Sequence, residues 1–221
     1  MAATTRDAHR FGELLACAAW RRGFYGSGRR AFVGDGSNAN WGVWERHFSS
    51  FTPVVDFIHA LTYVYQGAMA GRSAADGWPV YAGWIAALWS GDVAAVIAGL
   101  AARQAEVGEP DESDGESSPR RVVASALGYV RNQRERMRYG EYRRDGLPIT
   151  SCHVESTIKG VNRRVKGTEK FWSPDGAEAI LQLRADVLSE TDPLDAFWSR
   201  RAAQATGERR HRRATPDPLA A

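Results

Sequence analysis

The segment SCHVESTIKGVNRRVKG, residues 151–167, places a single carboxylate, Glu155, ahead of a run of cationic side chains. Helical spacing puts this acid on one polar face with Lys159, Asn162, Arg163 and Lys166. A carboxylate can ligate a hard divalent cation, and the side chains behind it can bind a phosphate backbone. The alternative is a surface helix on which Glu155 and Lys159 form an i,i+4 ion pair, which contributes only about 0.3–0.5 kcal/mol.

Two other acids stand where short predicted strands end. The segment AFVGDG, residues 31–36, contains Asp35, and TPVVDF, residues 52–57, contains Asp56. Carboxylates from different elements can hold two hard cations about 3.5–4 Å apart around the oxygens of a phosphoryl-transfer reaction. Structural alternatives exist, because Asp-Gly is a common turn dipeptide. For Asp56, with His59 three positions later, we favour helix capping or a buried polar contact over direct metal binding.

Hydrophobic spacing predicts the elements that carry these residues. Each of the two strand-like segments is followed by a helical pattern. This β-α-β-α order predicts a parallel or mixed sheet flanked by helices, in a helix-rich α/β fold. From about residue 60 to 145 the strand signals give way to three helical blocks and one polar, acidic loop, residues 108–119. Two more helical blocks follow Glu155, at residues 176–190 and 193–205.

Charge is segregated along the 221 residues, although the net charge is only +3. Acidic residues gather at 106–116, and basic residues gather in three stretches, 131–144, 159–170 and 200–213. Such segregation indicates a polyanionic partner, most simply nucleic acid, although a solvated surface also explains each run separately.

The two cysteines, Cys17 and Cys152, are far apart and have no metal-ligand spacing. They indicate neither a disulfide framework nor a structural zinc site, so we expect a reducing, cytoplasmic compartment. We also expect no signal peptide and no membrane span, because no apolar run has the required length.

Several ordered segments resemble bacterial insertion-sequence transposases of the Kra type, which are distant relatives of the Mutator-like enzymes. The resemblance covers roughly residues 10–202 and is most specific around Glu155. It is carried by GDGSNANWGVWERHF, VVDFIHALTYVY, GLPITSCHVESTIKGVNRRVKGTEKFW, GAEAILQLRADVLS and PLDAFWSRR.

This resemblance implies a partial ribonuclease H-like core with a large all-helical insertion, and an Asp, Asp, Glu triad that binds two Mg²⁺ ions and cuts and joins DNA ends. In that scheme Asp35 is the second aspartate and Glu155 is the glutamate, both catalytic and both metal ligands. Three residues would support the ligands without binding metal directly: Asp56, His59 and His153. Spacing along one helix makes Lys159, Asn162, Arg163 and Lys166 the expected contacts to the DNA backbone, and Arg164 and Lys170 are expected DNA-binding residues as well.

The resemblance also divides the chain into expected parts. Residues 1–60 would form the partial core, 61–147 the helical insertion, 148–205 the core helices that bear Glu155, and 206–221 a disordered basic tail. Before Asp35 the acids are Asp7 and Glu13, both in a helical stretch rather than at a strand end. The first catalytic aspartate therefore has no counterpart here, and we expect a C-terminal portion of a transposase, from a truncated or split reading frame, that binds Mg²⁺ weakly and is inactive alone.

Two alternatives remain open. The chain could be a non-catalytic DNA-binding or assembly fragment that associates with itself, with a complete transposase or with a separately encoded N-terminal piece. It could also be an unrelated, mainly helical protein whose Trp78, Trp84 and Trp89 serve only packing. In the transposase interpretation the protein works in the bacterial cytoplasm, associated with the nucleoid.

Overall fold

A computed structural model of the protein describes residues 2–165 and 171–205, without the side chains of residues 153, 155, 160 and 162–164. The protein is 67% helical and has a small two-stranded parallel sheet, which confirms the predicted helix-rich α/β class. It divides into two compact units: Arg6–Gly160, and residues 1–5 with 161–221. The domain bounds given above stay predictions, and the predicted tail, residues 206–221, lies outside the described residues.

The sheet lies in the larger unit and consists of β1 (Ala31–Gly34) and β2 (Thr52–Val55). The strands are parallel, with Ala31 opposite Thr52 and Gly34 opposite Val55. The helix α2 (Asn38–His47) connects them, and the side chain of Ser37 caps its first turn. Because parallel strands end at the same edge, this register brings the residues that follow β1 and β2 to one edge of the sheet.

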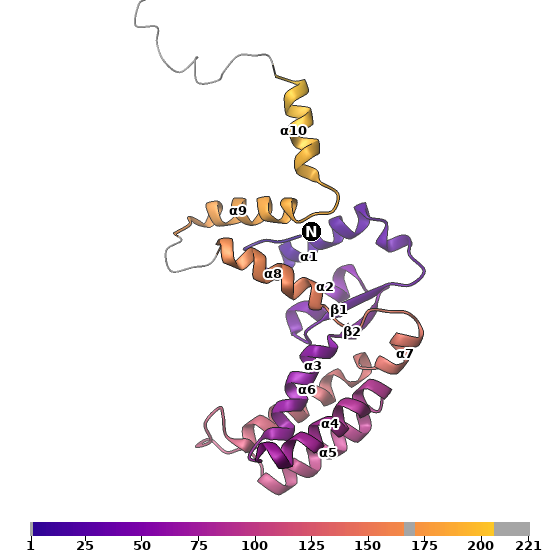
Figure 1. Ribbon diagram of the computed structural model, residues 1–221, viewed down its shortest axis with the longest axis vertical. Coiled ribbons are helices and arrows are strands. Elements are labelled where there is room, and N and C mark those ends of the chain that lie inside the picture. The colour runs from indigo at the N-terminus through magenta and orange to yellow at the C-terminus, as the bar shows by residue number, and fades with distance from the viewer. Residues whose placement is uncertain (1, 166–170, 206–221) are drawn as a thin grey trace, which may run out of the picture. The chain divides into compact units, whose positions relative to one another are not determined.

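A helical layer accounts for the stretch in which the sequence predicts no strands. Its helices are α3 (Phe57–Met69), α4 (Ala74–Ser90), α5 (Val93–Val107) and α6 (Pro119–Gln133). They pack beside one another below the sheet (Figure 1). Fully buried aliphatic side chains fill the space between them: Val64, Leu88, Val96, Leu100, Val123 and Val130. The tryptophans of α4 differ, because Trp84 packs against this core while Trp78 and Trp89 are exposed.

Shorter elements complete the larger unit. The helix α1 (Ala8–Arg21) packs on α2, and the two share a second apolar cluster made of Ala19, Val43, Phe48 and Phe51. A single 3-10 turn, η1 (Phe24–Gly26), precedes β1. After α6 come η2 (Arg134–Arg136), α7 (Tyr139–Arg144) and α8 (Cys152–Val165), the last of which continues into the smaller unit.

The smaller unit contains α9 (Pro174–Val187) and α10 (Pro193–Ala203), which pack together. Its N-terminal residues are attached to α9 by Glu178, whose carboxylate accepts hydrogen bonds from the Thr4 hydroxyl and from the backbone N–H and hydroxyl of Thr5. The bonds from Thr5 lower the pKa of Glu178 to about 2. In the described part of the chain, no helix is both long and apolar enough to cross a membrane.

A glycine sets the distance between three helices of the layer. A Cβ at Gly67 of α3 would stand 2.5 Å from the Cδ2 of Leu100 and 3.2 Å from the Cβ of Ala126. Both of those residues are fully buried and cannot move into solvent. A Cβ at Gly128 of α6, in contrast, would meet nothing within 4 Å.

We therefore expect Gly67→Ala to lower the free energy of unfolding by about 1–3 kcal/mol through overpacking. The matched change Gly128→Ala should raise it by up to about 1 kcal/mol, because alanine favours the helix. Urea unfolding followed by circular dichroism measures both values. Equal effects of the two changes would contradict the close packing at Gly67.

Candidate functional site

Asp35 directly follows β1 and is exposed at the carboxyl edge of the sheet. Its Oδ1 atom accepts two hydrogen bonds, from the backbone N–H of Ser37 and from Nδ2 of Asn40, each 2.8 Å long. The hydroxyl of Ser37 is a third hydrogen-bond donor to this carboxylate. Partial burial raises the pKa of Asp35, but these bonds and the nearby His59 outweigh it, so the pKa lies below its ordinary value. The carboxylate is therefore ionised, and it is exposed at the sheet edge.

Asp56 follows β2 at the same edge but is 2% exposed. Its Oδ1 caps α3 by accepting the backbone N–H of His59 at 2.9 Å. Its Oδ2 accepts hydrogen bonds from both the backbone N–H and the hydroxyl of Ser151. Capping with a buried polar contact, the interpretation favoured from the sequence, is what the structure shows, and both oxygens are engaged.

The contact between Asp56 and Ser151 positions the start of α8. Ser151 immediately precedes that helix, and Glu155 is its fourth residue. The backbone N–H of Phe57 also donates to the carbonyl of Ile149, which holds the approach to α8 against the end of β2. The helix that bears Glu155 therefore begins at the sheet edge that carries Asp35. The side chains of Glu155 and His153 lie outside the described residues, so their roles stay predictions.

His59, in the first turn of α3, lies near both acids of the sheet edge. Its ring meets the rings of Tyr63 and Tyr129 edge-on, at centroid distances of 5.7 and 6.1 Å. It is close enough to Asp35 to help lower the pKa of that carboxyl. This location agrees with the supporting role that was predicted for His59. The metal site that it would support remains a prediction.

The expected DNA-binding face of α8 is described in part. Lys159 is exposed, whereas Lys166 and Lys170 and the side chains of Asn162, Arg163 and Arg164 lie outside the described residues.

Helical spacing places Val154, Ile158, Val161 and Val165 in an apolar stripe beside the polar face, and this stripe is expected to pack. Val161 is buried, but Val154 is 56% exposed and Ile158 49% exposed. The expectation that the whole stripe packs is therefore wrong for its first half. Helical periodicity identifies an apolar face but does not supply a partner for it.

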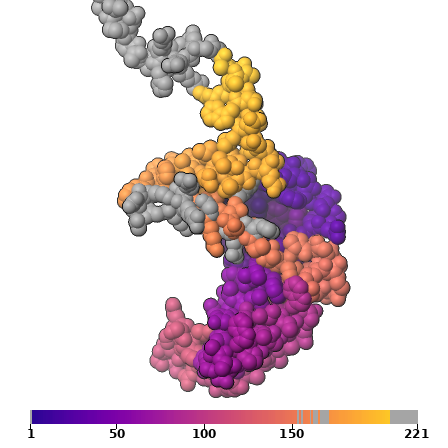
Figure 2. Space-filling view, in the orientation of Figure 1, coloured from indigo at the N-terminus to yellow at the C-terminus, as the bar shows by residue number. Residues whose placement is uncertain are grey.

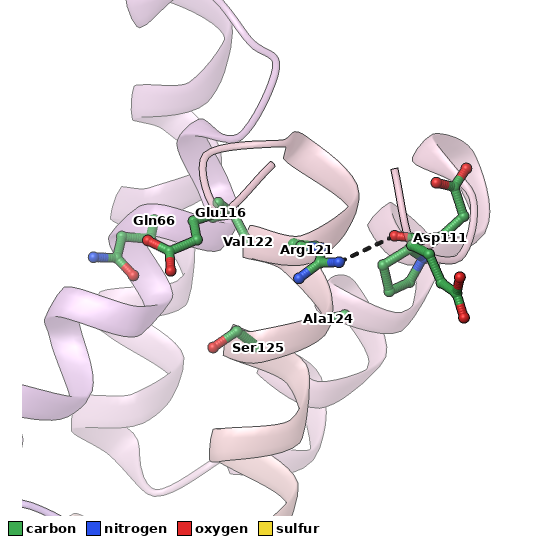
Figure 3. A pocket seen from close by; sticks show the side chains of 9 residues that line it. Gln66, Asp111, Glu116, Arg121, Val122, Ala124 and Ser125 are labelled. Atoms are coloured by element: carbon green, nitrogen blue, oxygen red, sulfur yellow. Dashed lines mark hydrogen bonds between the residues drawn. The ribbon is translucent and has the colours of Figure 1, made fainter. Parts of the chain in front are cut away.

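A groove lies elsewhere, between α3, α6 and the acidic loop (Figure 3). Its volume is about 730 Å³. Asp111, Glu112 and Glu116 line it, and Arg121 donates a hydrogen bond to the carbonyl of Asp111. The loop, in pink, stands at the outer end of the helical layer, away from the sheet (Figure 2). Three carboxylates would repel a phosphate backbone, so this groove does not fit DNA.

No family model matches this chain, and neither the curated proteins nor the solved structures contain a significant match. Among the side chains that the structure describes, no three His, Cys, Asp or Glu residues gather to hold a metal ion. The side chain of Glu155 is not among those described. The donor chemistry of Asp35 nevertheless suits a hard cation, because it offers an ionised and exposed carboxylate.

Sequence reasoning missed the residues that hold the two acids in place. Asn40 had a local signal, because it lies five positions after Asp35 at the start of the next helix. Tyr129, Gln133 and Ser151 had none, because they reach the sheet edge from more than 90 positions away.

The contact between Asp56 and Ser151 leads to a stability prediction. Asp56→Asn keeps an oxygen for the α3 cap but replaces the other with an NH₂ group that cannot accept from Ser151. We expect the free energy of unfolding to fall by about 1–3 kcal/mol, with faster amide hydrogen exchange at the start of α8. Ser151→Ala removes the hydroxyl alone and should cost about 0.5–1.5 kcal/mol. Unchanged exchange at Cys152–Val154 in Asp56→Asn would show that this contact does not anchor α8.

Proposed function

We propose that the protein is a portion of a DNA transposase of the Asp, Asp, Glu type, in which Asp35 and Glu155 are metal ligands and α8 contacts DNA. One observation carries the proposal. An ionised, exposed carboxylate, that of Asp35, lies at the carboxyl edge of a parallel sheet, and the helix that bears Glu155 is anchored to the same edge through Asp56. Two parallel strands joined by a crossover helix are compatible with part of a ribonuclease H-like core.

In this proposal Asp35 and Glu155 would hold Mg²⁺, and a bound pair of such ions supplies activation of water for strand cleavage and of the freed 3′ hydroxyl for transfer. Ser37 and Asn40 orient the Asp35 carboxylate, and Lys159 binds the phosphate backbone beside it. Asp56 does not serve as a ligand, because both of its oxygens accept hydrogen bonds within the protein.

A second candidate function is DNA binding or assembly without cleavage. It is favoured by the positions of the acids that precede Asp35. Asp7 caps α1, and Glu13 lies on α1 in an ion pair with Arg10, so neither stands at a strand end. In this second candidate the protein partners with a complete transposase and does not itself cleave DNA. Cation binding separates the two candidates.

Cation binding is measured with Mn²⁺ as a probe for Mg²⁺, by electron paramagnetic resonance. If the proposal is correct, the protein binds Mn²⁺, and Asp35→Asn and Glu155→Gln each weaken binding on the order of tenfold or more, because each removes a charged ligand. Glu112→Gln, in the acidic loop, is the control and should leave the affinity unchanged. Loss of binding in the control but not in the other two variants would assign the ion to the loop and leave the non-catalytic candidate.

DNA binding is tested on α8. Lys159→Ala and Lys166→Ala should each weaken binding to duplexes of any sequence and reduce the slope of log K against log salt by about 0.9, because each removes one phosphate contact. Arg121→Ala, beside the acidic loop, removes the same charge and serves as the control. An unchanged salt slope in both lysine variants would contradict a DNA-binding role for α8.

A further inference from the structure

The turn that carries Asp35 is held by two side chains of one helix. The hydroxyl of Tyr129 donates to the backbone carbonyl of Asp35 at 2.8 Å, and Nε2 of Gln133 donates to the carbonyl of Gly36 at 2.9 Å. Both donors belong to α6, four positions apart and hence on the same face. Two consecutive carbonyls at the sheet edge are thus fixed from the helical layer.

The bond from Gln133 acts on the Asp35 carboxylate through a single peptide group. The carbonyl of Gly36 and the N–H of Ser37 belong to the same planar peptide. Gln133 holds the carbonyl end of this plane, and Oδ1 of Asp35 accepts from its N–H end at 2.8 Å. The position of Gln133 therefore sets the direction of the N–H group that orients the carboxylate.

Gln133 is itself fixed on its other side. It is 7% exposed, and its Oε1 accepts hydrogen bonds from Nε1 of Trp41 at 3.0 Å and from the guanidinium of Arg136 at 3.2 Å. That guanidinium also lies over the Trp41 ring, 4.5 Å from its centroid. Because a buried amide with all these partners cannot rotate freely, its bond to Gly36 has a defined direction.

Tyr129 is fixed by its ring. It stacks on Tyr63 of α3 with a centroid distance of 3.8 Å and an interplanar angle of 5°. Burial, followed by the neighbouring Tyr63 and the two aspartates, raises the pKa of Tyr129, so its hydroxyl stays a hydrogen-bond donor at neutral pH. The ring also lies so close to Gly36 that a Cβ there would stand 2.8 Å from it, and Gly36 has a positive φ of 94°. Glycine is required at this turn for both reasons.

We propose that Tyr129 and Gln133 are positioning residues that set the cation affinity of Asp35 by fixing the turn and the N–H group that orient its carboxylate. This inference rests on the proposed function, because it assumes that Asp35 binds a cation. It goes further by making the helical layer a part of the site. Partners that support a metal ligand through hydrogen bonds commonly change metal affinity by about 10- to 100-fold when they are removed.

The chain offers a matched pair of variants for the test. Tyr129→Phe removes the hydroxyl that binds the turn, and Tyr63→Phe removes a hydroxyl from the same stacked pair that makes no hydrogen bond to the described residues. Gln133→Glu is a second variant, which keeps the acceptor for Trp41 and loses the donor to Gly36. Circular dichroism checks that each variant folds. If Tyr129→Phe does not fold, Gln133→Glu alone tests the positioning role.

Two quantities are measured on each folded variant: Mn²⁺ affinity by electron paramagnetic resonance, and hydrogen exchange of the Ser37 amide by NMR. We expect Tyr129→Phe and Gln133→Glu to weaken Mn²⁺ binding about tenfold and to speed exchange at Ser37, with Tyr63→Phe matching the unchanged protein. A purely structural role would leave the Mn²⁺ affinity where it was.

The outcomes separate this inference from the function on which it rests. If the unchanged protein binds Mn²⁺ through Asp35, but Tyr129→Phe and Gln133→Glu bind it as tightly as Tyr63→Phe does, the positioning role is overturned and the proposed function stands. If the unchanged protein does not bind Mn²⁺, or binds it equally well after Asp35→Asn, both are overturned.

Discussion

The buried carboxylate of Asp56 is the constraint on which the larger unit depends. It accepts hydrogen bonds from His59, in the first turn of α3, and from Ser151, which precedes α8 and lies 95 positions after Asp56. A polar group this deeply buried is unfavourable unless hydrogen bonds compensate for its lost hydration. The helical segment therefore begins and ends at the same strand end, that of β2. As a result, α8 starts beside this end of the sheet.

A second connection joins the helical layer to the sheet through α6 and the turn after β1. The layer is thus attached at both strand ends, by Asp56 at β2 and by the Asp35–Gly36 turn at β1. A helical segment inserted into a sheet protein could in principle be joined only by its two ends. Here its middle also supports the exposed carboxylate, so the geometry of the candidate site depends on the packing of α3 against α6.

Local patterns were sufficient to predict the elements but not the contacts between them. The apolar segments before Asp35 and Asp56 predicted both strands, and the spacing of Asp56 and His59 predicted the cap on α3. The contacts of Tyr129 and Ser151 join residues that no sequence period relates. Val154 shows the opposite limit, because its helical spacing predicted burial and it is 56% exposed among the described residues. The ribonuclease H-like core and the relation to Kra-type transposases remain predictions.

The long sequence separation of the contacts at the sheet edge has a consequence for the order of folding. The strand pair and its crossover helix span only 25 residues, from Ala31 to Val55, whereas the bonds from Tyr129 and Ser151 must wait until the intervening helices have formed and packed. Contacts between distant residues carry the larger loop-closure cost and tend to form late. A nascent or partly unfolded chain therefore lacks an assembled carboxylate edge, and whatever chemistry that edge performs is confined to the completely folded protein.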